Sequence, residues 1–326
     1  MSIDLKIMSL KNLIKFKDAR FIFDVLAKDD KKARFVGGCV RDMILKREAK
    51  NIDVDIGTTL HPDEIEKVFS QYPNVKTIDV GKEYGTVMVV VNHHTYEITA
   101  LRKDVHTDGR YAVVEYTDDW EEDASRRDFT INGMSYSPHE EKLYDYFNGQ
   151  EDLKVGLIKF IGEPQKRVEE DYLRILRLFR FYTYYGKTID PASLAACKKY
   201  AKHLDRLSQE RKMSELYRIL SHIDYIETLE LMTANKILEH VSSLPDWGSG
   251  IKLCKKLEKI CSSYGCEFPP TLKIFALFRK EGIAPSQIAK EFITLSKKEK
   301  KYLTALTRLV NSFTLNDLLT RPHYVF

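Results

Sequence analysis

The chain has 326 residues, of which 43% are hydrophobic and 31% charged; this globular mixture speaks against intrinsically disordered and collagen-like classes. No apolar run approaches the roughly eighteen residues that a membrane span needs, so we expect no membrane partner. Five cysteines without a C-x-x-C pair favour neither a disulfide framework nor a structural zinc site, and the N-terminus lacks a secretory core, so we expect a cytoplasmic protein.

Up to about residue 162, helix-like and strand-like segments alternate. A short amphipathic helix is expected within residues 1–20, and a second helix over His61–Gln71, where acidic residues precede apolar residues at helical spacing. Runs rich in Val, Ile, Thr and Tyr predict strands. These strands are expected over residues 34–38, 52–57, 85–92, 95–101 and 142–147.

After residue 162 the strand signals nearly vanish. One long helix is expected over Glu163–Gly186, and several shorter helices follow to the C-terminus. The pattern therefore predicts an α+β fold with a small mixed-sheet head and an all-helical arm. Residues 251–326 hold 14 basic and 6 acidic residues, a net charge of +8, which suits a module that binds a polyanion. A solvated helix face around Lys297–Lys301 would give the same excess.

Two glycines stand between a strand and an amphipathic stretch. Gly37 and Gly38 end "RFVGG" and precede "VRDMILK". Glycines at such a junction let backbone N–H groups approach a phosphate closely, and the following helix adds the positive end of its dipole. Arg41 supplies a guanidinium suited to phosphate oxygens. Glycines alone would also be compatible with an ordinary turn.

Two aspartates stand one residue apart in "NIDVDIG". On a strand, Asp53 and Asp55 project from the same face, and two carboxylates that close repel each other unless a cation lies between them. Magnesium is the usual cation where phosphates are handled. A half-buried strand with a solvated acidic face would explain the pair alone. With the glycines nearby, the pattern favours a site for a triphosphate and Mg²⁺.

Four motifs in order resemble a known family. "FVGGCVRD" with "NIDVDIGT", then "EEDASRRDFTINGMSY", "EEDYLRILRLFRF" and "LSQERKMSELYRIL", are similar to the motifs of class II tRNA nucleotidyltransferases and bacterial poly(A) polymerases. The resemblance covers roughly residues 30–220. It implies a polymerase β-like nucleotidyltransferase head (1–162), a helical neck that recognises the base (163–225), and a basic helical body and tail that binds tRNA (226–326).

The resemblance also implies roles for single residues. Glu97 is a third acidic group near the metals, and the segment Arg102–Asp123 resembles a loop that helps to switch from C to A addition. The resemblance further implies that Arg127 and Asp128 contact the triphosphate and the ribose of the nucleotide, with Asn132 nearby. It implies additional contacts with the nucleotide for Arg177 and Arg180.

The base-recognising motif can also be interpreted chemically. On one helix, Asp171 and Arg174 lie one turn apart, and Asp only accepts hydrogen bonds while Arg only donates them. Cytosine and adenine both present an exocyclic amine beside a ring-nitrogen acceptor, so this pair can satisfy either base. Uracil and guanine present the reversed pattern and would leave a buried group unpaired. A surface ion pair at i, i+3 is the alternative.

These observations predict template-independent addition of C, C and A to the 3′ end of tRNA from CTP and ATP, by two-metal nucleotidyl transfer. The alternatives are a poly(A) polymerase, a partial CC- or A-adding tRNA nucleotidyltransferase, and a non-catalytic RNA-binding protein. The sequence does not indicate an oligomeric state.

Overall fold

The computed structural model describes residues 14–27, 32–47, 53–81, 84–107, 112–278 and 296–301. The chain divides into two compact units, and each is described by itself. The first comprises residues 1–171 and 185–193, and the second comprises residues 172–184 and 194–326. The predicted division into parts at residues 162 and 225 stays a prediction.

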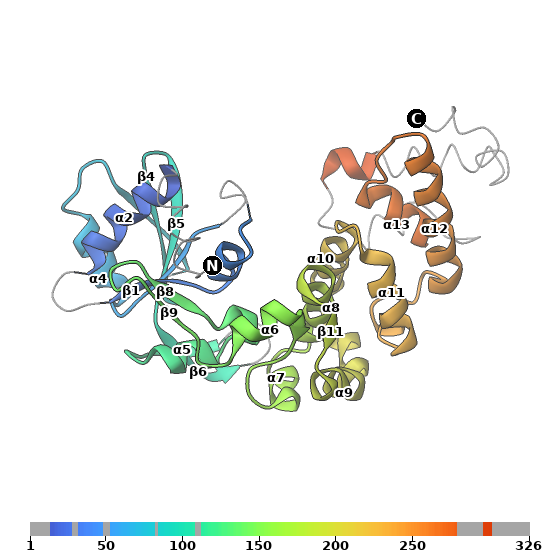
Figure 1. Ribbon diagram of the computed structural model, residues 1–326, viewed down its shortest axis with the longest axis horizontal. Helices are drawn as coiled ribbons and strands as arrows, with labels where there is room; N and C mark the ends of the chain where they lie inside the picture. The colour runs from blue at the N-terminus through green and yellow to red at the C-terminus, as the bar shows by residue number, and fades with distance from the viewer. Residues whose placement is uncertain are drawn as a thin grey trace. The chain divides into compact units, whose positions relative to one another are not determined.

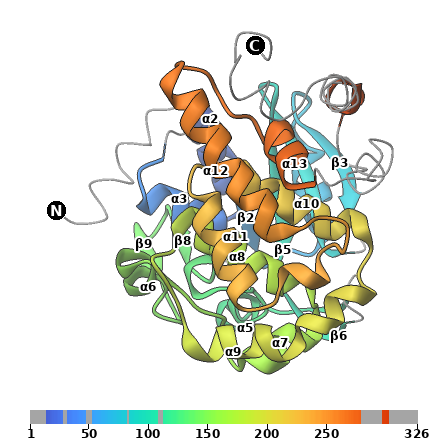
Figure 2. The ribbon, with the colours of Figure 1, turned by 90° about the vertical axis from the view of Figure 1, so that its right-hand side faces the viewer.

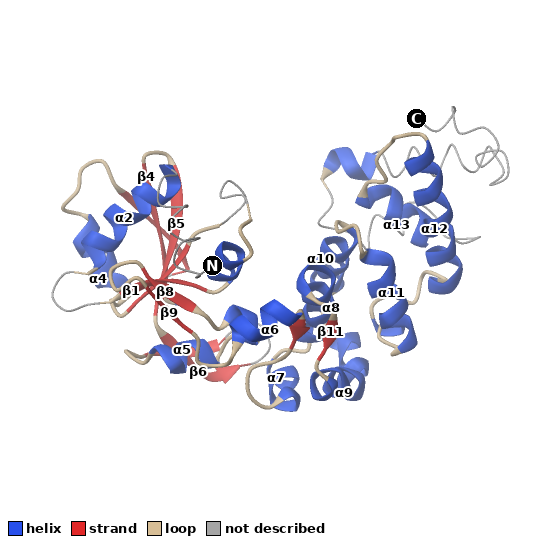
Figure 3. Cartoon of the chain, in the orientation of Figure 1, coloured by secondary structure: helices blue, strands red, loops and turns tan. Residues whose placement is uncertain are grey.

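A seven-stranded mixed sheet forms the centre of the first unit (Figures 1 and 3). Its strand order is β3-β4-β5-β2-β1-β8-β9, and every neighbouring pair is antiparallel except β2 and β5, which are parallel. The strands are β1 (Ala33–Val36), β2 (Asp55–Thr58), β3 (Lys76–Gly81), β4 (Thr86–Val91), β5 (His94–Ala100), β8 (Ser135–Ser137) and β9 (Lys142–Tyr144).

Most of the expected head elements are present. The structure confirms strands at β1, β2, β4, β5 and β9, and it confirms the helix after residue 61 as α4 (Pro62–Phe69). That helix begins with a capping box, in which the His61 backbone N–H donates to Glu64 Oε2 at 2.8 Å. Sequence reasoning missed β3, where Lys76 and Asp79 interrupt the apolar pattern, and β8, which is only three residues long.

Helices and a hairpin complete the first unit. Helix α2 (Ile14–Leu26) packs on β1 and α4, while α4 packs on β3 and β4. The helix expected within residues 1–20 overlaps α2, and residues 1–13 lie outside the described residues. The other elements are α3 (Gly38–Ile44), the hairpin of β6 (Arg102–Thr107) and β7 (Ala112–Tyr116), α5 (Trp120–Ser125), η3 (Thr130–Asn132), α6 (Gly149–Val155), β10 (Leu157–Ile158), α7 (Pro164–Glu170) and β11 (Thr188–Ile189).

The single long helix expected over Glu163–Gly186 is wrong. Helix α7 ends at Glu170, and α8 (Leu173–Tyr185) begins three residues later. Asp171 between them has an extended backbone, with φ −154° and ψ 108°. Asp is a poor residue for a helix interior, while the apolar spacing continues through the break and hides it.

The described residues of the second unit are helical, and α12 and α13 lie side by side (Figure 2). Its helices are α8, α9 (Pro191–Tyr200), η4 (Ala201–Arg206), α10 (Gln209–Leu220), α11 (Tyr225–Ala234), η5 (Leu238–His240), α12 (Trp247–Ser263) and α13 (Pro270–Phe278). Gly250 of α12 allows close packing, since a Cβ there would lie 2.7 Å from the carbonyl oxygen of Leu277. In the described parts of the chain, no helix is long and apolar enough to cross a membrane.

Candidate functional site

The Gly37–Gly38 turn lies between β1 and α3. Gly37 has φ +67°, which favours glycine, and its N–H donates to Met134 O at 3.0 Å. A Cβ on Gly37 would lie 2.5 Å from Arg127 Nη1, and one on Gly38 would lie 3.4 Å from Arg41 Nη2. Two guanidinium groups therefore flank the turn, and the missing side chain at Gly37 makes room for one of them.

Arg41 connects the Gly37–Gly38 turn to the segment Arg126–Asn132. Its guanidinium is buried and donates through Nη1 to Asn132 Oδ1 at 2.5 Å. The same group contacts Asp42 through Nε at 3.0 Å and Nη2 at 3.1 Å, and it lies 4.0 Å from the ring centroid of Tyr185. Asn132 Nδ2 in turn donates to Asp128 Oδ1 at 3.0 Å. The structure thus brings together Arg41, Asn132 and Asp128.

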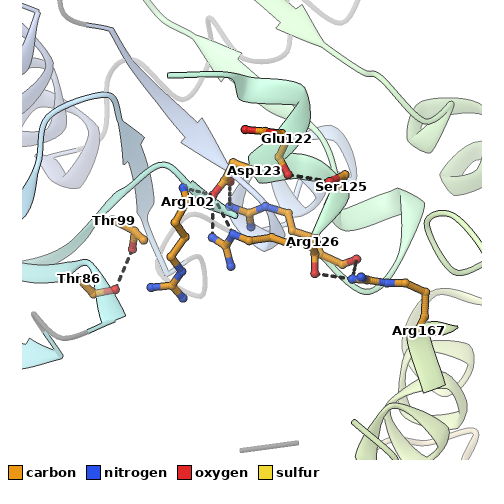
Figure 4. Close-up of polar contacts among 9 residues, drawn as sticks. Thr86, Thr99, Arg102, Glu122, Asp123, Ser125, Arg126 and Arg167 are labelled. Atoms are coloured by element: carbon orange, nitrogen blue, oxygen red, sulfur yellow. Dashed lines mark hydrogen bonds and ion pairs between the residues drawn. The ribbon is translucent and has the colours of Figure 1, made fainter. Parts of the chain in front are cut away.

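A buried carboxylate, that of Asp123, forms ion pairs with the two arginines of the RRD triplet, Arg126–Asp128 (Figure 4). Asp123 of α5 is 3% exposed, and its oxygens contact Arg126 at 2.8 Å and Arg127 at 3.2 Å. Burial alone would raise the pKa of Asp123, but the guanidinium groups of Arg126 and Arg127 outweigh burial and hold that pKa below its ordinary value. Sequence reasoning did not assign Asp123 this role, although its i, i+3 and i, i+4 spacing to the arginines was a usable signal.

The acidic residues lie at the start of β2 and on β5. Asp55 is opposite Glu97 in the parallel register of β2 and β5, so the two side chains share a face of the sheet. The strand begins at Asp55, whereas we expected it to include Asp53. Exposure still alternates: Asp53 is exposed, Val54 is buried, Asp55 is intermediate and Ile56 is buried. This alternation supports a common orientation of the two aspartates.

A hydrogen bond joins β2, which begins at Asp55, to the residue that follows the Gly37–Gly38 turn. The Cys39 thiol, on the residue after Gly38, donates to the backbone oxygen of Asp55 at 3.7 Å. Burial, and next the nearby Asp55 carboxylate, raise the pKa of this thiol, so it stays protonated as a donor. The first turn of α3 and the first residue of β2 are therefore in contact.

The carboxylate oxygens at β2 suit a hard divalent ion. Among the residues that the structure describes, no group of three or more His, Cys, Asp or Glu side chains could hold a metal ion. Glu97 is thus in register with Asp55 but does not complete a three-residue cluster with the aspartates. Magnesium is commonly bound by one or two carboxylates together with substrate phosphates, and Asp53 and Asp55 fit that arrangement.

The neck residues are divided between the units. Asp171 follows α7 in the first unit, whereas Arg174, Arg177 and Arg180 lie on α8 in the second. The expectation that Asp171 and Arg174 are one turn apart on a single helix is therefore wrong. Arg180 Nε contacts Glu215 Oε2 of α10 at 2.7 Å, so it supports packing within the second unit. The guanidinium carbon of Arg177 lies 5.6 Å from the ring centroid of Phe181.

Comparisons with known proteins agree with the motifs. Residues 33–159 match the family described as "Poly A polymerase head domain", and residues 186–247 match "Probable RNA and SrmB- binding site of polymerase A". The human mitochondrial CCA tRNA nucleotidyltransferase 1 is 41% identical over 212 residues, which are 62% of this chain and 47% of the relative. The CCA-adding enzyme of Staphylococcus epidermidis is 38% identical over 228 residues, 69% of this chain and 55% of the relative.

A solved structure extends the similarity to most of the chain. The Bacillus stearothermophilus CCA-adding enzyme in complex with CTP is 26% identical, with a TM-score of 0.73, and the match covers 92% of this chain and 71% of that one. The chain spans about half the length of the curated relatives that it matches. The two family matches together cover more than half of the chain, in the order of the motifs, and the solved structure shares its α+β architecture. The chain belongs to the family of tRNA nucleotidyltransferases and bacterial poly(A) polymerases.

Proposed function

We propose that the chain adds C, C and A to the 3′ end of tRNA from CTP and ATP, without a nucleic-acid template. The observation that carries this proposal is the head site, where two guanidinium groups flank Gly37–Gly38 and a hydrogen-bonded chain leads from Arg41 to Asp128. The similarity to CCA-adding enzymes, one of them in complex with CTP, supports the choice of substrates.

The side chains around the turn suit a nucleoside triphosphate. Arg41 and Arg127 would bind its phosphates, because a guanidinium presents paired donors to phosphate oxygens. Asp128 would accept from the ribose hydroxyls, and its Oδ1 already accepts from the Phe129 N–H and Asn132 Nδ2, both at 3.0 Å. Those two donors fix the orientation of the carboxylate. A site of this kind positions the α-phosphorus without bonding covalently to it.

In the proposed reaction, the 3′-hydroxyl of the RNA attacks the α-phosphorus in line and pyrophosphate leaves. Asp53 and Asp55 would hold Mg²⁺ beside the nucleotide phosphates, where it would activate the hydroxyl and neutralise charge on the leaving group. Glu97, opposite Asp55, adds negative charge on the same face of the sheet. Arg41 and Arg127 provide fixed positive charge for the pyrophosphate.

Base selection is assigned to the neck. Asp171 would accept from the exocyclic amine of cytosine or adenine, and Arg174 would donate to the ring nitrogen. Arg177 and Arg180 are assigned further contacts with the nucleotide, and for Arg180 the ion pair with Glu215 gives an additional structural role. The basic C-terminal part would hold the tRNA backbone. Action in the cytoplasm stays a prediction, since the human relative is named mitochondrial.

Incorporation assays on defined tRNA ends test the proposal. Three transcripts are needed: one ending before CCA, one ending after its second C, and one ending after the final A. We expect CTP to be added to the first and ATP to the second, with no addition to the third. Long A tails with no use of CTP would instead establish the poly(A) polymerase alternative, and addition at only one step would establish a partial enzyme.

Shortening the β6–β7 hairpin should separate C addition from A addition. Residues 108–111 lie outside the described residues, and Thr107 pairs with Ala112 on the opposite strand. Replacing residues 108–111 by Asn-Gly joins the paired strands with a two-residue turn and so keeps the hairpin. If the loop acts only in the switch, C addition should stay near wild type and A addition should fall about tenfold, as measured on the first two transcripts. An equal loss of both would mean that the hairpin merely supports the head.

Neutralising four lysines near residue 299 should weaken tRNA binding. Lys297, Lys298 and Lys301 are exposed and Lys300 is half-exposed on a helical turn. Replacing all four by Gln should lower the tRNA affinity and reduce the slope of log K against log salt by roughly 0.7–0.9 for each lost phosphate contact. Turnover at saturating tRNA should change little.

A control removes the same charge from the first unit by replacing Lys67, Lys76, Lys142 and Lys154 with Gln. We expect this control to retain the wild-type salt slope. Equal slopes for the two quadruple variants would show that the lysines around residue 299 are only a solvated helix face.

A further inference from the structure

Arg167 of α7 contacts the main chain of the RRD triplet (Figure 4). The side chain is largely buried, at 11% exposure, and Nη2 donates to the carbonyl oxygens of Arg126 and, at 2.7 Å, Arg127. Its other terminal nitrogen, Nη1, contacts the Glu170 carboxylate at 2.7 Å. A single planar group therefore bonds two consecutive carbonyls on one side and a carboxylate on the other.

The two carbonyls belong to the turn that carries the proposed ribose contact. Arg126 is the C-terminal cap of α5, where carbonyls lack helical partners and favour a cation. Asp123 holds the side chains of Arg126 and Arg127, while Arg167 holds their backbone. The turn that leads to Asp128 is thus fixed both through its side chains and through its main chain.

The carboxylate on the other side of Arg167 belongs to the last residue of α7. Glu170 immediately precedes Asp171, whose backbone is extended. By holding Glu170, Arg167 fixes the end of the helix from which Asp171 emerges. All of these residues belong to the first unit, so the link is internal to it.

We propose that Arg167 is a positioning residue that sets the proposed ribose-contacting turn and the proposed base-contacting Asp171 in register with each other. This inference rests on the function proposed above. Arg167 itself touches neither nucleotide nor metal in this scheme. Its loss should therefore reduce selectivity for the sugar and the base more than it reduces turnover, since the groups that Arg167 orients are the proposed sugar and base contacts and not the proposed metal ligands.

Two variants separate the two ends of the link. Arg167→Gln removes the contacts at both ends. The sugar preference (CTP over dCTP) and the base preference (CTP plus ATP over UTP plus GTP) should each fall about tenfold, and kcat with CTP should fall less. Glu170→Ala breaks only the end at Asp171, so the base preference should fall while the sugar preference remains. Arg167→Lys keeps a cation at the carbonyls and should restore part of the sugar preference.

Lys166→Gln is the matched control, because Lys166 lies on the same helix and is exposed, in an ion pair with Glu163. It should retain wild-type values of both ratios. Thermal unfolding should remain cooperative in every variant. Glu170 is partly exposed, so Glu170→Ala provides the decisive ratios if Arg167→Gln does not fold. An unchanged base ratio in Glu170→Ala, or an equal loss with all nucleotides in Arg167→Gln, would overturn the proposal.

Equilibrium binding of CTP and dCTP, without tRNA, separates this inference from the proposed function. If the wild-type chain added nothing to tRNA but bound CTP better than dCTP, the CCA-adding function would fail and the positioning role would still be measurable. Equal dCTP-to-CTP binding ratios in wild type and Arg167→Gln would reject the positioning role even in a chain that adds CCA.

Discussion

Replacing Asp53 or Asp55 with Ala should reduce incorporation of both CTP and ATP at least about a thousandfold, which corresponds to about 4 kcal/mol of transition-state stabilisation. The reason is that these carboxylates are the proposed ligands beside the triphosphate, and each nucleotide needs them equally. The measurement is single-turnover incorporation on tRNA ending before CCA and on tRNA ending after its second C. The fold should survive, since each change relieves repulsion between two neighbouring carboxylates.

Glu121→Ala provides the control for these two variants. Glu121 is an exposed carboxylate on α5 of the same unit and has no assigned role in the site. It should keep near wild-type rates, and all three variants should unfold at similar temperatures. Substantial activity in Asp53→Ala or Asp55→Ala would contradict the assignment of the pair as metal ligands.

The second large effect concerns base choice. Losing Asp171 or Arg174 should cost about 1–3 kcal/mol of discrimination against UTP and GTP, the usual penalty for one buried polar group without a partner. Exchanging them, as Asp171→Arg with Arg174→Asp, reverses the donor and acceptor pattern. The ratio of UTP plus GTP to CTP plus ATP incorporation should then rise, although the overall rate should fall because Arg is longer than Asp.

Only that ratio is diagnostic, because a loss of rate alone also follows from misfolding. Arg206→Lys is a useful comparison, as it changes an exposed arginine of the second unit that has no assigned nucleotide contact, while preserving its charge. If the single and double variants all lose activity while base preference stays constant, Asp171 and Arg174 support the neck structurally and another group reads the base.

The fold of the head could be predicted well because strands such as β4 and β5 are runs of β-branched and aromatic residues that the sequence shows directly. The roles of Gly37, Arg41, Arg127 and Asp128 stay predictions, although the structure brings the Gly37–Arg41 and Arg127–Asn132 segments together. Asp123 was harder to recognise because an acidic residue near arginines on a short helix is also common on solvated surfaces.

The neck was predicted less accurately, for a physical reason. Apolar spacing reports which side of a segment is buried, and this spacing continues from α7 into α8 without a gap. Whether the helix continues through residue 171 depends on local backbone preference and on tertiary contacts such as that of Arg167 with Arg127. Contacts between residues 40 positions apart leave no periodic signal in the sequence.

The short parallel pair β10–β11 limits how the chain can be divided. After α8, residues 185–193 return to the first unit, where Ile158 pairs with Ile189 and the Phe160 N–H donates to the Ser193 hydroxyl at 3.2 Å. The polypeptide therefore crosses between the units three times. A fragment that stops at residue 171 leaves β10 without its neighbouring strand, so the first unit is not a contiguous module that truncation or gene fusion could transfer intact.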